Sequence, residues 1–332
     1  MSLRRTSAAD FSRPQPLPSV ALWRERSESM LLAEHAFDLA RALDINKLLV
    51  DADALQDIQE ITLLRRSEDI IWVAMKREEL DRHFEPRDNI VCLSAKKLNR
   101  TSRIKLSILH ALINGYLRLD ERIICISGVS GASALDTLLI VNPYRDFSWL
   151  GGRGLQHLAT LTSTGVFETL IDIALHFAAE GREGRPIGTT FIIGEPAELA
   201  GHCHQMMLNP LHGHPAHARS VLNRSFHETL RELAALDGAL IINQNGIVQS
   251  AGTYISVPAK RIALRSGLGA RHAAAASLSA HTGSIAIVIS ESSGTVTVFY
   301  RGRMILELEK PTPPLVRPKR ERLAPQDQPE NG

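Results

Sequence analysis

Three consecutive residues form the first place in this sequence where chemistry can be expected. Asp237, Gly238 and Ala239 stand between a predicted helix and a predicted strand. An aspartate at the edge of a strand can hold Mg²⁺ or orient a hydroxyl nucleophile, and a glycine beside it lets a ligand approach the backbone. Taken alone, Gly238 also fits the left-handed residue that ends a helix, so a structural role stays open.

An arginine-histidine pair is the second candidate, and its position favours an anion. Arg271 and His272 follow Gly267 and Gly269 and lead into the alanines 273–276. Because alanine is a strong helix former, we expect the pair in the first turn of a helix. The helix dipole already makes that end positive, so the pair indicates an anion bound there with free backbone N–H groups. The alternative is an exposed arginine and a histidine with its own hydrogen bonds.

Two short turns carry weaker signals. Residues 290–294 are typical of a polar hairpin turn, but Glu291 can complete a metal site with Asp237 if the two strand ends are neighbours. Residues 127–131 follow a predicted strand and contain neither of the glycine-rich patterns that cradle phosphates. We therefore interpret 127–131 as a structural turn.

A group of histidines raises the question of zinc. Their spacing matches no structural zinc pattern, and no acidic residue stands beside them to orient a ligand. We therefore favour a surface loop over a metal site for the six residues His202, Cys203, His204, His212, His214 and His217.

The first half of the chain alternates between helical and strand periodicity. Short apolar strands separated by helices predict right-handed crossovers and a largely parallel sheet. We therefore expect an α/β layer domain over residues 28–150. The predicted helices are 30–43, 58–64 and 103–117, and the predicted strands are 47–50, 69–74, 89–93 and 121–126.

The second half has its own α/β pattern, and a flexible connection at 149–154 precedes it. We expect a mixed sheet flanked by helices over residues 155–309, with a capping box formed by Ser225 and Glu228. The predicted helices are 165–179, 225–236 and 271–280, and the predicted strands are 189–193, 239–242, 247–251, 284–290, 295–299 and 304–308.

Composition limits which binding partners and which cellular compartment can be expected for this protein. The 332 residues are 44% hydrophobic and carry a net charge of +2, which names neither nucleic acid nor an anionic membrane as a partner. Three cysteines form no disulfide framework or zinc pattern, and there is neither a membrane-length apolar run nor a secretory leader. We expect a cytoplasmic protein whose proline-rich ends, 1–27 and 310–332, are disordered.

Four ordered motifs together resemble a diadenylate cyclase domain, and the resemblance covers roughly residues 160–308. The motifs are 236–242, with Asp-Gly-Ala, 251–255, 267–272, with Arg-His, and 285–291, with Ser-Glu. The upstream stretches 180–186, 193–195 and 209–212 are similar to the archaeal-type branch of this family. In that branch an N-terminal α/β domain resembling the C-terminal domain of pyruvate kinase precedes the cyclase.

The resemblance implies condensation of two ATP molecules to cyclic di-AMP, with two pyrophosphates released. It implies that the 3′-hydroxyl of each nucleotide attacks the α-phosphate of the other, across two facing copies of the domain, with Mg²⁺ or Mn²⁺ as cofactor. For catalysis, the resemblance implies that Asp237 binds metal and activates the hydroxyl, and that Glu291 also binds metal. It implies that the phosphates are bound by Arg271, His272 and Ser290. For the rest of ATP, it implies that the ribose approaches Gly238, that adenine contacts Tyr254 and Ile255, and that further contacts are made at Ala239, Gly269 and Ala270.

The second motif departs from the commonest family pattern. Where many members have threonine and a second arginine around the Arg-His pair, this chain has Ala270 and Ala273. The departure keeps a second hypothesis open, a nucleotide-binding or cyclic-dinucleotide-binding regulator with the same fold and impaired catalysis. A third hypothesis, a nucleic-acid scaffold, rests on the basic residues of the C-terminal tail; deletion of 311–332 would then abolish DNA retention.

Overall fold

The computed structural model describes most of both predicted α/β parts. The described residues are 28–55, 69–75, 88–93, 98–128, 134–147, 158, 160, 165–183, 185–258 and 267–310. The predicted helix 58–64, the connection 149–154, the N-terminal segment and all but Lys310 of the C-terminal tail lie outside the described residues. Within these ranges no helix is both long and apolar enough to span a bilayer.

The N-terminal sheet has five strands in the order β3-β2-β1-β4-β5. The first four are parallel to one another, which confirms the predicted largely parallel sheet, and β5 joins β4 antiparallel at one edge. The bounds are β1 Lys47–Asp51, β2 Ile70–Ala74, β3 Asn89–Cys92, β4 Ile123–Gly128 and β5 Leu135–Val141. The sequence analysis assigned no strand to 135–141.

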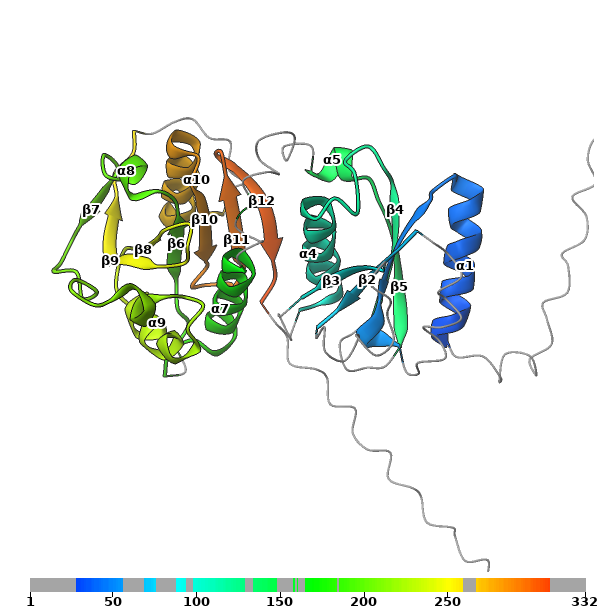
Figure 1. The fold of residues 1–332 in the computed structure, drawn as a ribbon, viewed down its shortest axis with the longest axis horizontal. Coiled ribbons are helices and arrows are strands. Elements are labelled where there is room, and N and C mark those ends of the chain that lie inside the picture. The colour runs from blue at the N-terminus through cyan, green and yellow to red at the C-terminus, as the bar shows by residue number, and fades with distance from the viewer. Residues whose placement is uncertain are drawn as a thin grey trace, which may run out of the picture.

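Two helices cover opposite faces of this sheet. Because side chains alternate along a strand, Leu48 and Val50 pack in one cluster with helix α1, Glu28–Leu43, whereas Leu49 packs in another with helix α4, Arg100–Ile113. Figure 1 shows α1 on the outer side and α4 on the side that faces the rest of the molecule. α4 begins before the predicted 103 because the Asn99 side chain accepts from the N–H of Ser102. Shorter elements are η2 Ala52–Ala54 and α5 Pro143–Phe147.

The C-terminal sheet has seven strands in the order β12-β11-β10-β6-β8-β9-β7. β6 and β8 are parallel and the other pairs are antiparallel, so the predicted mixed sheet is confirmed. The bounds are β6 Thr189–Ile193, β7 Cys203–Gln205, β8 Ala239–Ile242, β9 Val248–Ile255, β10 Ile285–Ile289, β11 Val296–Tyr300 and β12 Arg303–Leu308.

Helices also cover both faces of the second sheet. α7, Val166–Glu180, packs on the face that contains Phe191 and Ile193, and α10, Ala270–Thr282, packs on the face that contains Ile192. The remaining helical elements are α8 Pro196–Leu199, η4 Ala216–Arg219, η5 Arg224–Phe226 and α9 His227–Ala234.

The predicted capping box at Ser225 is wrong. Asn223 is the residue that accepts from the backbone N–H of Ser225, at 3.2 Å, and α9 starts only at His227 after a 3-10 turn. The Ser225 hydroxyl instead donates to Asn223 Oδ1 at 2.8 Å. An asparagine two residues earlier therefore takes the role that the Ser-x-x-Glu spacing assigned to Ser225.

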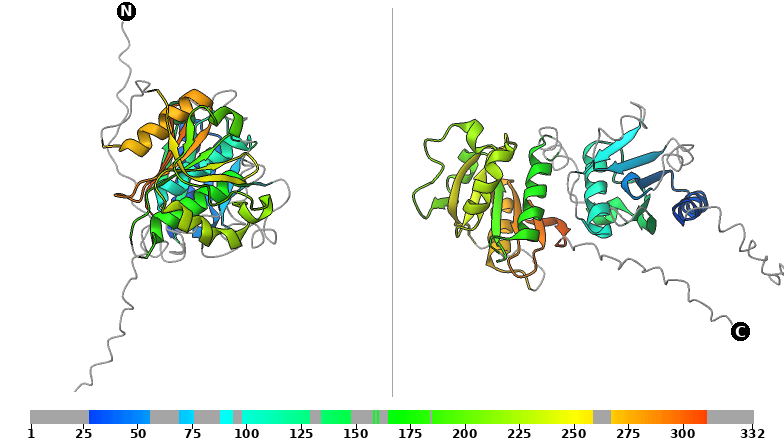
Figure 2. Two further views of the ribbon diagram at one scale, coloured as in Figure 1. Left: turned by 90° about the vertical axis from the view of Figure 1, so that its left-hand side faces the viewer. Right: turned by 90° about the horizontal axis from the view of Figure 1, so that it is seen from below.

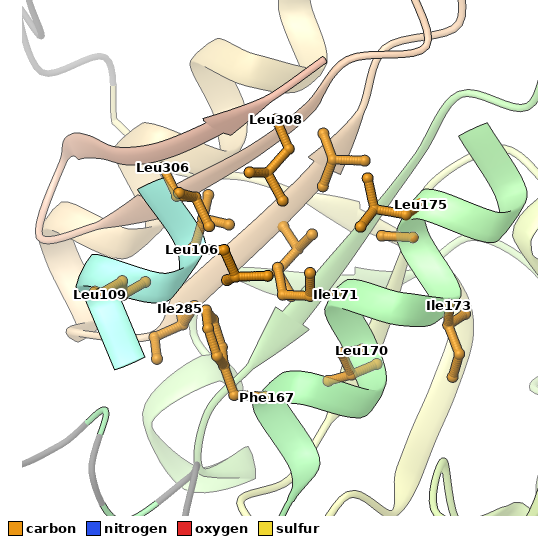
Figure 3. Close-up of a cluster of buried hydrophobic side chains, with 14 of the residues drawn as sticks. Leu106, Leu109, Phe167, Leu170, Ile171, Ile173, Leu175, Ile285, Leu306 and Leu308 are labelled. Carbon is orange, nitrogen blue, oxygen red and sulfur yellow. The ribbon is translucent and has the colours of Figure 1, made fainter. Parts of the chain in front are cut away.

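The two sheets lie side by side, and α4 forms the contact between them (Figures 1 and 2). Leu106 and Leu109 of α4 belong to one buried cluster with Phe167 of α7 and with Leu306 and Leu308 of β12 (Figure 3). At the end of β12 the N–H of Glu309 donates to the Ser102 hydroxyl at 3.2 Å. The helix that completes the first core is thus also part of the second.

Candidate active site

Two cavities meet in the C-terminal part of the molecule, and Asp237 and Arg271 line both of them. The larger cavity has a volume of about 960 Å³ and is lined by the glycine-rich start of α10 and the 290–293 turn. The smaller has a volume of about 230 Å³ and is lined by residues of β8 and β9, among them Tyr254 and Ile255. The structure therefore brings together motifs that are far apart in the sequence.

Arg271 stands between two carboxylates at the start of α10. Gly269 caps the helix, so Arg271 lies in its first turn as predicted. Its Nη2 is 3.9 Å from Asp237 Oδ1 and its Nη1 is 3.2 Å from Glu291 Oε2. All three side chains are exposed, so these ion pairs are weak in water and the guanidinium can turn to another anion.

Gly238 is required by the packing of its neighbours. Its φ of +101° lies in the region that favours glycine, and a Cβ there would lie 2.8 Å from the backbone N and O of Thr253 on β9 and 2.7 Å from Met206 Cε. Helix α9 already ends at Ala234, so Gly238 is not its stop. The predicted approach of a ribose at Gly238 stays a prediction. Asp237 extends into solvent, and its Oδ1 accepts from the Gly238 N–H at 3.0 Å.

His272 is buried, although its ring lines the larger cavity. Its ring lies edge-on to Phe299 at 6.1 Å, and desolvation lowers the pKa of the imidazole below its usual value. Glu307 opposes this shift and Arg271 adds to it. A neutral histidine at this place can form a hydrogen bond to a phosphate but adds no charge.

The turn after β10 places Ser290 and Glu291 on the larger cavity, as the sequence predicts. The sequence analysis missed the segment that packs beneath them. A Cβ on Gly188 would lie 2.7 Å from Arg271 Nη1 and 2.7 Å from Glu291 Cβ, so this glycine makes room for the ion pair. The pair of Pro186 and Gly188, just before β6, was the available signal, since such residues mark a backbone that another group approaches closely.

The smaller cavity is mostly apolar. Tyr254 and Ile255 lie on its wall together with Ala239 and with Met206, which was not predicted, and the contact of Tyr254 and Ile255 with adenine stays a prediction. Met206 directly follows β7, a three-residue strand that pairs with the end of β9 and whose sequence shows no clear periodicity. A flat aromatic ring, a thioether and an aliphatic side chain suit a planar base.

The charges on the larger cavity explain what an anionic ligand would need. Among the described residues that line it, Arg271 is the single cation, whereas Asp237, Glu291 and Glu307 are acidic. A polyphosphate would be repelled by this lining unless cations came with it. Asp237 and Glu291 offer exposed carboxylate oxygens, the ligands that Mg²⁺ and Mn²⁺ prefer when they also bind phosphate, so the donor set fits such an ion.

The predicted surface loop is confirmed only in part, because Cys203 and His204 belong to the edge strand β7 and His217 to the 3-10 helix η4. His204, His212, His214 and His217 are exposed, and His202 is half-buried with its ring 5.8 Å from that of His281. Across the described ranges no group of three metal-binding side chains gathers. The structure thus gives the zinc alternative no support.

Comparisons with known proteins identify two families along the chain. Residues 176–304 match the family described as "DisA bacterial checkpoint controller nucleotide-binding", and residues 27–143 match the one described as "Probable sensor domain DacZ_P". The predicted resemblance to pyruvate kinase and the assignment to the archaeal branch are not tested by these matches and stay predictions.

Curated relatives extend over most of the chain. A diadenylate cyclase of Methanocaldococcus jannaschii is 33% identical over 239 residues, which is 68% of this chain and 72% of the relative. One of Haloferax volcanii is 28% identical over 64% of this chain and 76% of the relative. A solved structure of DacA from Staphylococcus aureus covers 43% of this chain and 86% of its own, at 20% identity and a TM-score of 0.29. The chain therefore belongs to the diadenylate cyclase family of nucleotidyltransferases.

Proposed function

We propose that the two joined cavities hold one ATP, and that two such sites condense their nucleotides to cyclic di-AMP and two pyrophosphates. The observation that supports this most is the position of Asp237 and Arg271, which line both the apolar cavity and the polar one. A nucleotide with its base in the first and its phosphates in the second has its ribose and α-phosphate beside these two side chains.

Asp237 is the group that we propose takes part in bond formation. A new bond forms between the 3′-oxygen of one nucleotide and the α-phosphorus of the other, and the bond from that phosphorus to the bridging oxygen of the pyrophosphate breaks. Asp237 accepts a hydrogen bond from the attacking hydroxyl and orients it, and the hydroxyl proton leaves through this carboxylate. The pyrophosphate departs with the bonding electron pair, so charge and atoms balance.

The phosphates lie, in this proposal, at the N-terminus of α10. The first N–H groups of a helix have no partner within it and bind anions, and Arg271 adds a mobile positive charge. His272, neutral and buried, donates one hydrogen bond, and Ser290 lines the same cavity. These groups position the α-phosphate for in-line attack, which is the largest contribution that a protein makes to phosphoryl transfer.

A divalent cation completes the site, and we propose Mg²⁺ or Mn²⁺ bound by Asp237 with help from Glu291. Membership of the family implies dependence on a divalent metal in general, and the excess of carboxylates on the cavity gives a physical reason for it. Held by these two carboxylates, such an ion would supply the positive charge that the phosphates need and the cavity lining lacks. Glu291 must then release Arg271, which frees the guanidinium for the substrate.

The adenine would lie in the smaller cavity against Tyr254, Ile255 and Met206. Tyr254 is 58% exposed although it stands on the cavity wall, so a stacked base would cover part of an otherwise wet ring.

A second copy of the chain is part of the proposal, because the product joins two nucleotides and the described residues of one chain form one such site. Met206 and Tyr254, which line the smaller cavity, have exposed side chains, and the two residues that follow Met206 in the chain, Met207 and Leu208, are 45% and 95% exposed. Apolar side chains gathered in this way favour an interface between copies. We propose a homo-oligomer whose cyclase sites face each other, with no membrane or nucleic-acid partner.

One observation favours the second hypothesis, a nucleotide-binding regulator with impaired catalysis. Ala273 stands at the position of the second arginine of the commonest family pattern and is exposed in the first turn of α10, and Arg271 is the single cation on the described lining of the larger cavity. The two hypotheses differ in turnover and not in binding.

Product analysis separates them. Purified protein is incubated with ATP and either Mn²⁺ or Mg²⁺, and the products are resolved by chromatography after the oligomeric state has been measured. We expect cyclic di-AMP and pyrophosphate in a ratio of one to two. A confirmed oligomer that binds ATP and releases no cyclic di-AMP would establish the regulator instead.

A further inference from the structure

The N-terminal sheet changes its winding direction between β1 and β4. From β1 the chain builds β2 and β3 on one side, and then passes through α4 to place β4 on the other side. In open α/β sheets the carboxyl ends of the two strands at such a point border a crevice where ligands bind. Here β1 ends at Asp51 and β4 ends at Gly128.

Four polar side chains meet at these strand ends and form what we name the switch-point cluster: Asp51, Asp53, Arg103 and Ser127. Arg103 Nε and Nη2 donate to the two oxygens of Asp51, at 2.6 and 2.8 Å. Nη2 also donates to Asp53 Oδ2, and the Ser127 hydroxyl donates to Asp51 Oδ2 at 3.1 Å. The cluster joins β1, β4 and α4, and nothing in the proposed cyclase chemistry uses it.

One arm of the guanidinium has no acceptor. Three of the five N–H groups of Arg103 make the bonds above, and Nη1, which carries the other two, is buried with no hydrogen-bond partner among the described residues. The Arg103 side chain is 2% exposed, so bulk water does not replace the missing acceptor. An orphaned donor on a buried charged group is rare in folded proteins, and a bound water, ion or small molecule would supply the missing acceptor.

Asp53 gives the cluster an opening. Its side chain is 20% exposed, against 2% for Asp51 and for Arg103, so this is the place where a ligand can enter. Burial is also the largest cause of a raised pKa for the Asp53 carboxyl, although Arg103 opposes the shift. A carboxylate in that situation is stabilised by a further hydrogen-bond donor.

The charges of the cluster restrict the ligand. Two carboxylates and one guanidinium give a net charge of −1, so an anion that approached Nη1 would meet both aspartates. A metal ion that approached Asp53 would meet the guanidinium of Arg103 and leave Nη1 without its acceptor. A hydroxyl group satisfies both needs, because its oxygen accepts from Nη1 and its proton, or that of a neighbouring hydroxyl, is donated to Asp53.

We propose that the switch-point cluster binds a neutral molecule with adjacent hydroxyl groups, a sugar or the ribose of a nucleoside. The ligand would lie at the start of α4, the helix whose Leu106 and Leu109 contact the cyclase core (Figure 3). The N-terminal part of the chain would thereby carry its own small-molecule site, independent of ATP binding at Asp237 and Arg271.

The test is a thermal-shift titration of the full chain with D-ribose, D-glucose and uridine, and separately with inorganic phosphate and with MgCl₂. We expect at least one hydroxylated probe to raise Tm by about 2 °C or more at saturation. The rise should vanish in Asp53→Asn and persist in Asp136→Asn, which removes the other carboxylate that pairs with an arginine of α4. Sugars also stabilise proteins by exclusion from the surface, and that rise would be the same in both variants.

A second variant keeps the test informative if Asp53→Asn does not fold. Arg103→Lys keeps a positive charge beside Asp51 and lacks the Nη1 donor, and it too should lose the rise in Tm if it unfolds cooperatively. A rise that survives in Asp53→Asn or in Arg103→Lys overturns the proposal. So does the absence of any rise with the hydroxylated probes, which would leave an ordinary buried water as the partner of Nη1, or a rise dependent on Asp53 with phosphate or Mg²⁺ alone.

Discussion

The molecule contains two clusters of the same three groups, two carboxylates and one arginine, and they differ in burial. In the N-terminal sheet Asp51, Asp53 and Arg103 have side chains 2%, 20% and 2% exposed, and their hydrogen bonds are short. In the cyclase part the side chains of Asp237, Glu291 and Arg271 are 89%, 60% and 41% exposed. The Arg271 guanidinium lies 3.9 Å from the Asp237 carboxylate and 3.2 Å from that of Glu291.

This difference decides what each cluster can do. A buried cluster keeps a fixed geometry, because any group that loses its partner stays desolvated. An exposed cluster loses little when its ion pairs open, because water solvates each partner. The first is therefore suited to holding strands and a helix in place around a ligand, and the second to exchanging its internal ion pairs for substrate and metal.

The largest effect that we predict is on stability at the buried cluster. Arg103→Ala leaves the buried Asp51 with the Ser127 hydroxyl as its one remaining side-chain donor among the described residues, and should lower the free energy of unfolding by about 3–5 kcal/mol. Urea denaturation followed by circular dichroism measures it. A loss below about 1 kcal/mol would mean that the cluster is solvated in the folded protein.

The matched change at the exposed cluster should act on activity. Arg271→Ala removes the side chain that we propose binds phosphate and should lower the rate of cyclic di-AMP formation about 10²-fold, while the free energy of unfolding changes by less than about 1 kcal/mol. Initial rates and urea denaturation on one preparation give both numbers. Equal losses of stability in the Arg271 and Arg103 variants would remove the distinction between the clusters.

Much of the fold could be predicted because periodicity is a local property. The parallel strands of the first sheet and the Ala-rich helix after Gly269 follow directly from apolar spacing. β5 was missed because it is an edge strand whose Leu139 and Ile140 stay about two-fifths exposed, so its pattern does not reflect a core. The cap of α9 was misplaced because two residues with capping side chains, Asn223 and Ser225, compete for one turn.

The residues of the candidate site also divide into those that could be predicted from the sequence and those that could not. Asp237, Arg271 and Glu291 belong to segments with recognisable residue types, and the structure brings them to one cavity. Gly188 and Met206 were not predicted, because each matters only through a neighbour that is distant in sequence. For the same reason, the spacing of residues in the sequence does not predict the ion pair between Asp51 and Arg103.

A further pair, a buried histidine and a half-buried glutamate, extends the comparison to pH. Glu168 of α7 lies with its Oε1 3.7 Å from His110 Nδ1 of α4, in the contact between the two sheets. Burial lowers the pKa of His110 from 6.5 to about 4 and raises the pKa of Glu168 from 4.5 to about 7. Between pH 4.5 and 6.5 the unfolded chain binds the histidine proton and the folded chain binds the glutamate proton, so the two effects on stability cancel.

Each single variant should expose one of the two opposing effects. Relative to wild type, Glu168→Gln should make stability rise with pH from about 4 to 6.5, and His110→Asn should make it fall as pH rises from 4.5 to about 7. Either slope is at most about 1.4 kcal/mol per pH unit. Urea denaturation at half-unit pH intervals measures them, and parallel profiles for both variants would show that the pair is not buried in solution.

The smallest effect on the free energy of unfolding is expected for Arg100, three residues before Arg103 in the chain. Arg100, on the exposed side of the same α4 helix, pairs with Asp136 through its Nε at 2.6 Å. Arg100→Ala should change the free energy of unfolding by less than about 1 kcal/mol, because an exposed ion pair gains little. Urea denaturation beside Arg103→Ala checks it, and a loss of several kcal/mol would show that burial is not what separates the two arginines.

The rate of cyclic di-AMP formation in Asp237→Asn tests most directly the claim that the exposed cluster carries the chemistry. It is measured with Mn²⁺ and saturating ATP, against wild type and Asp136→Asn. The account predicts a loss of about 10³-fold in Asp237→Asn with an unchanged Tm, and a wild-type rate in Asp136→Asn. A wild-type rate in a folded Asp237→Asn protein would contradict it.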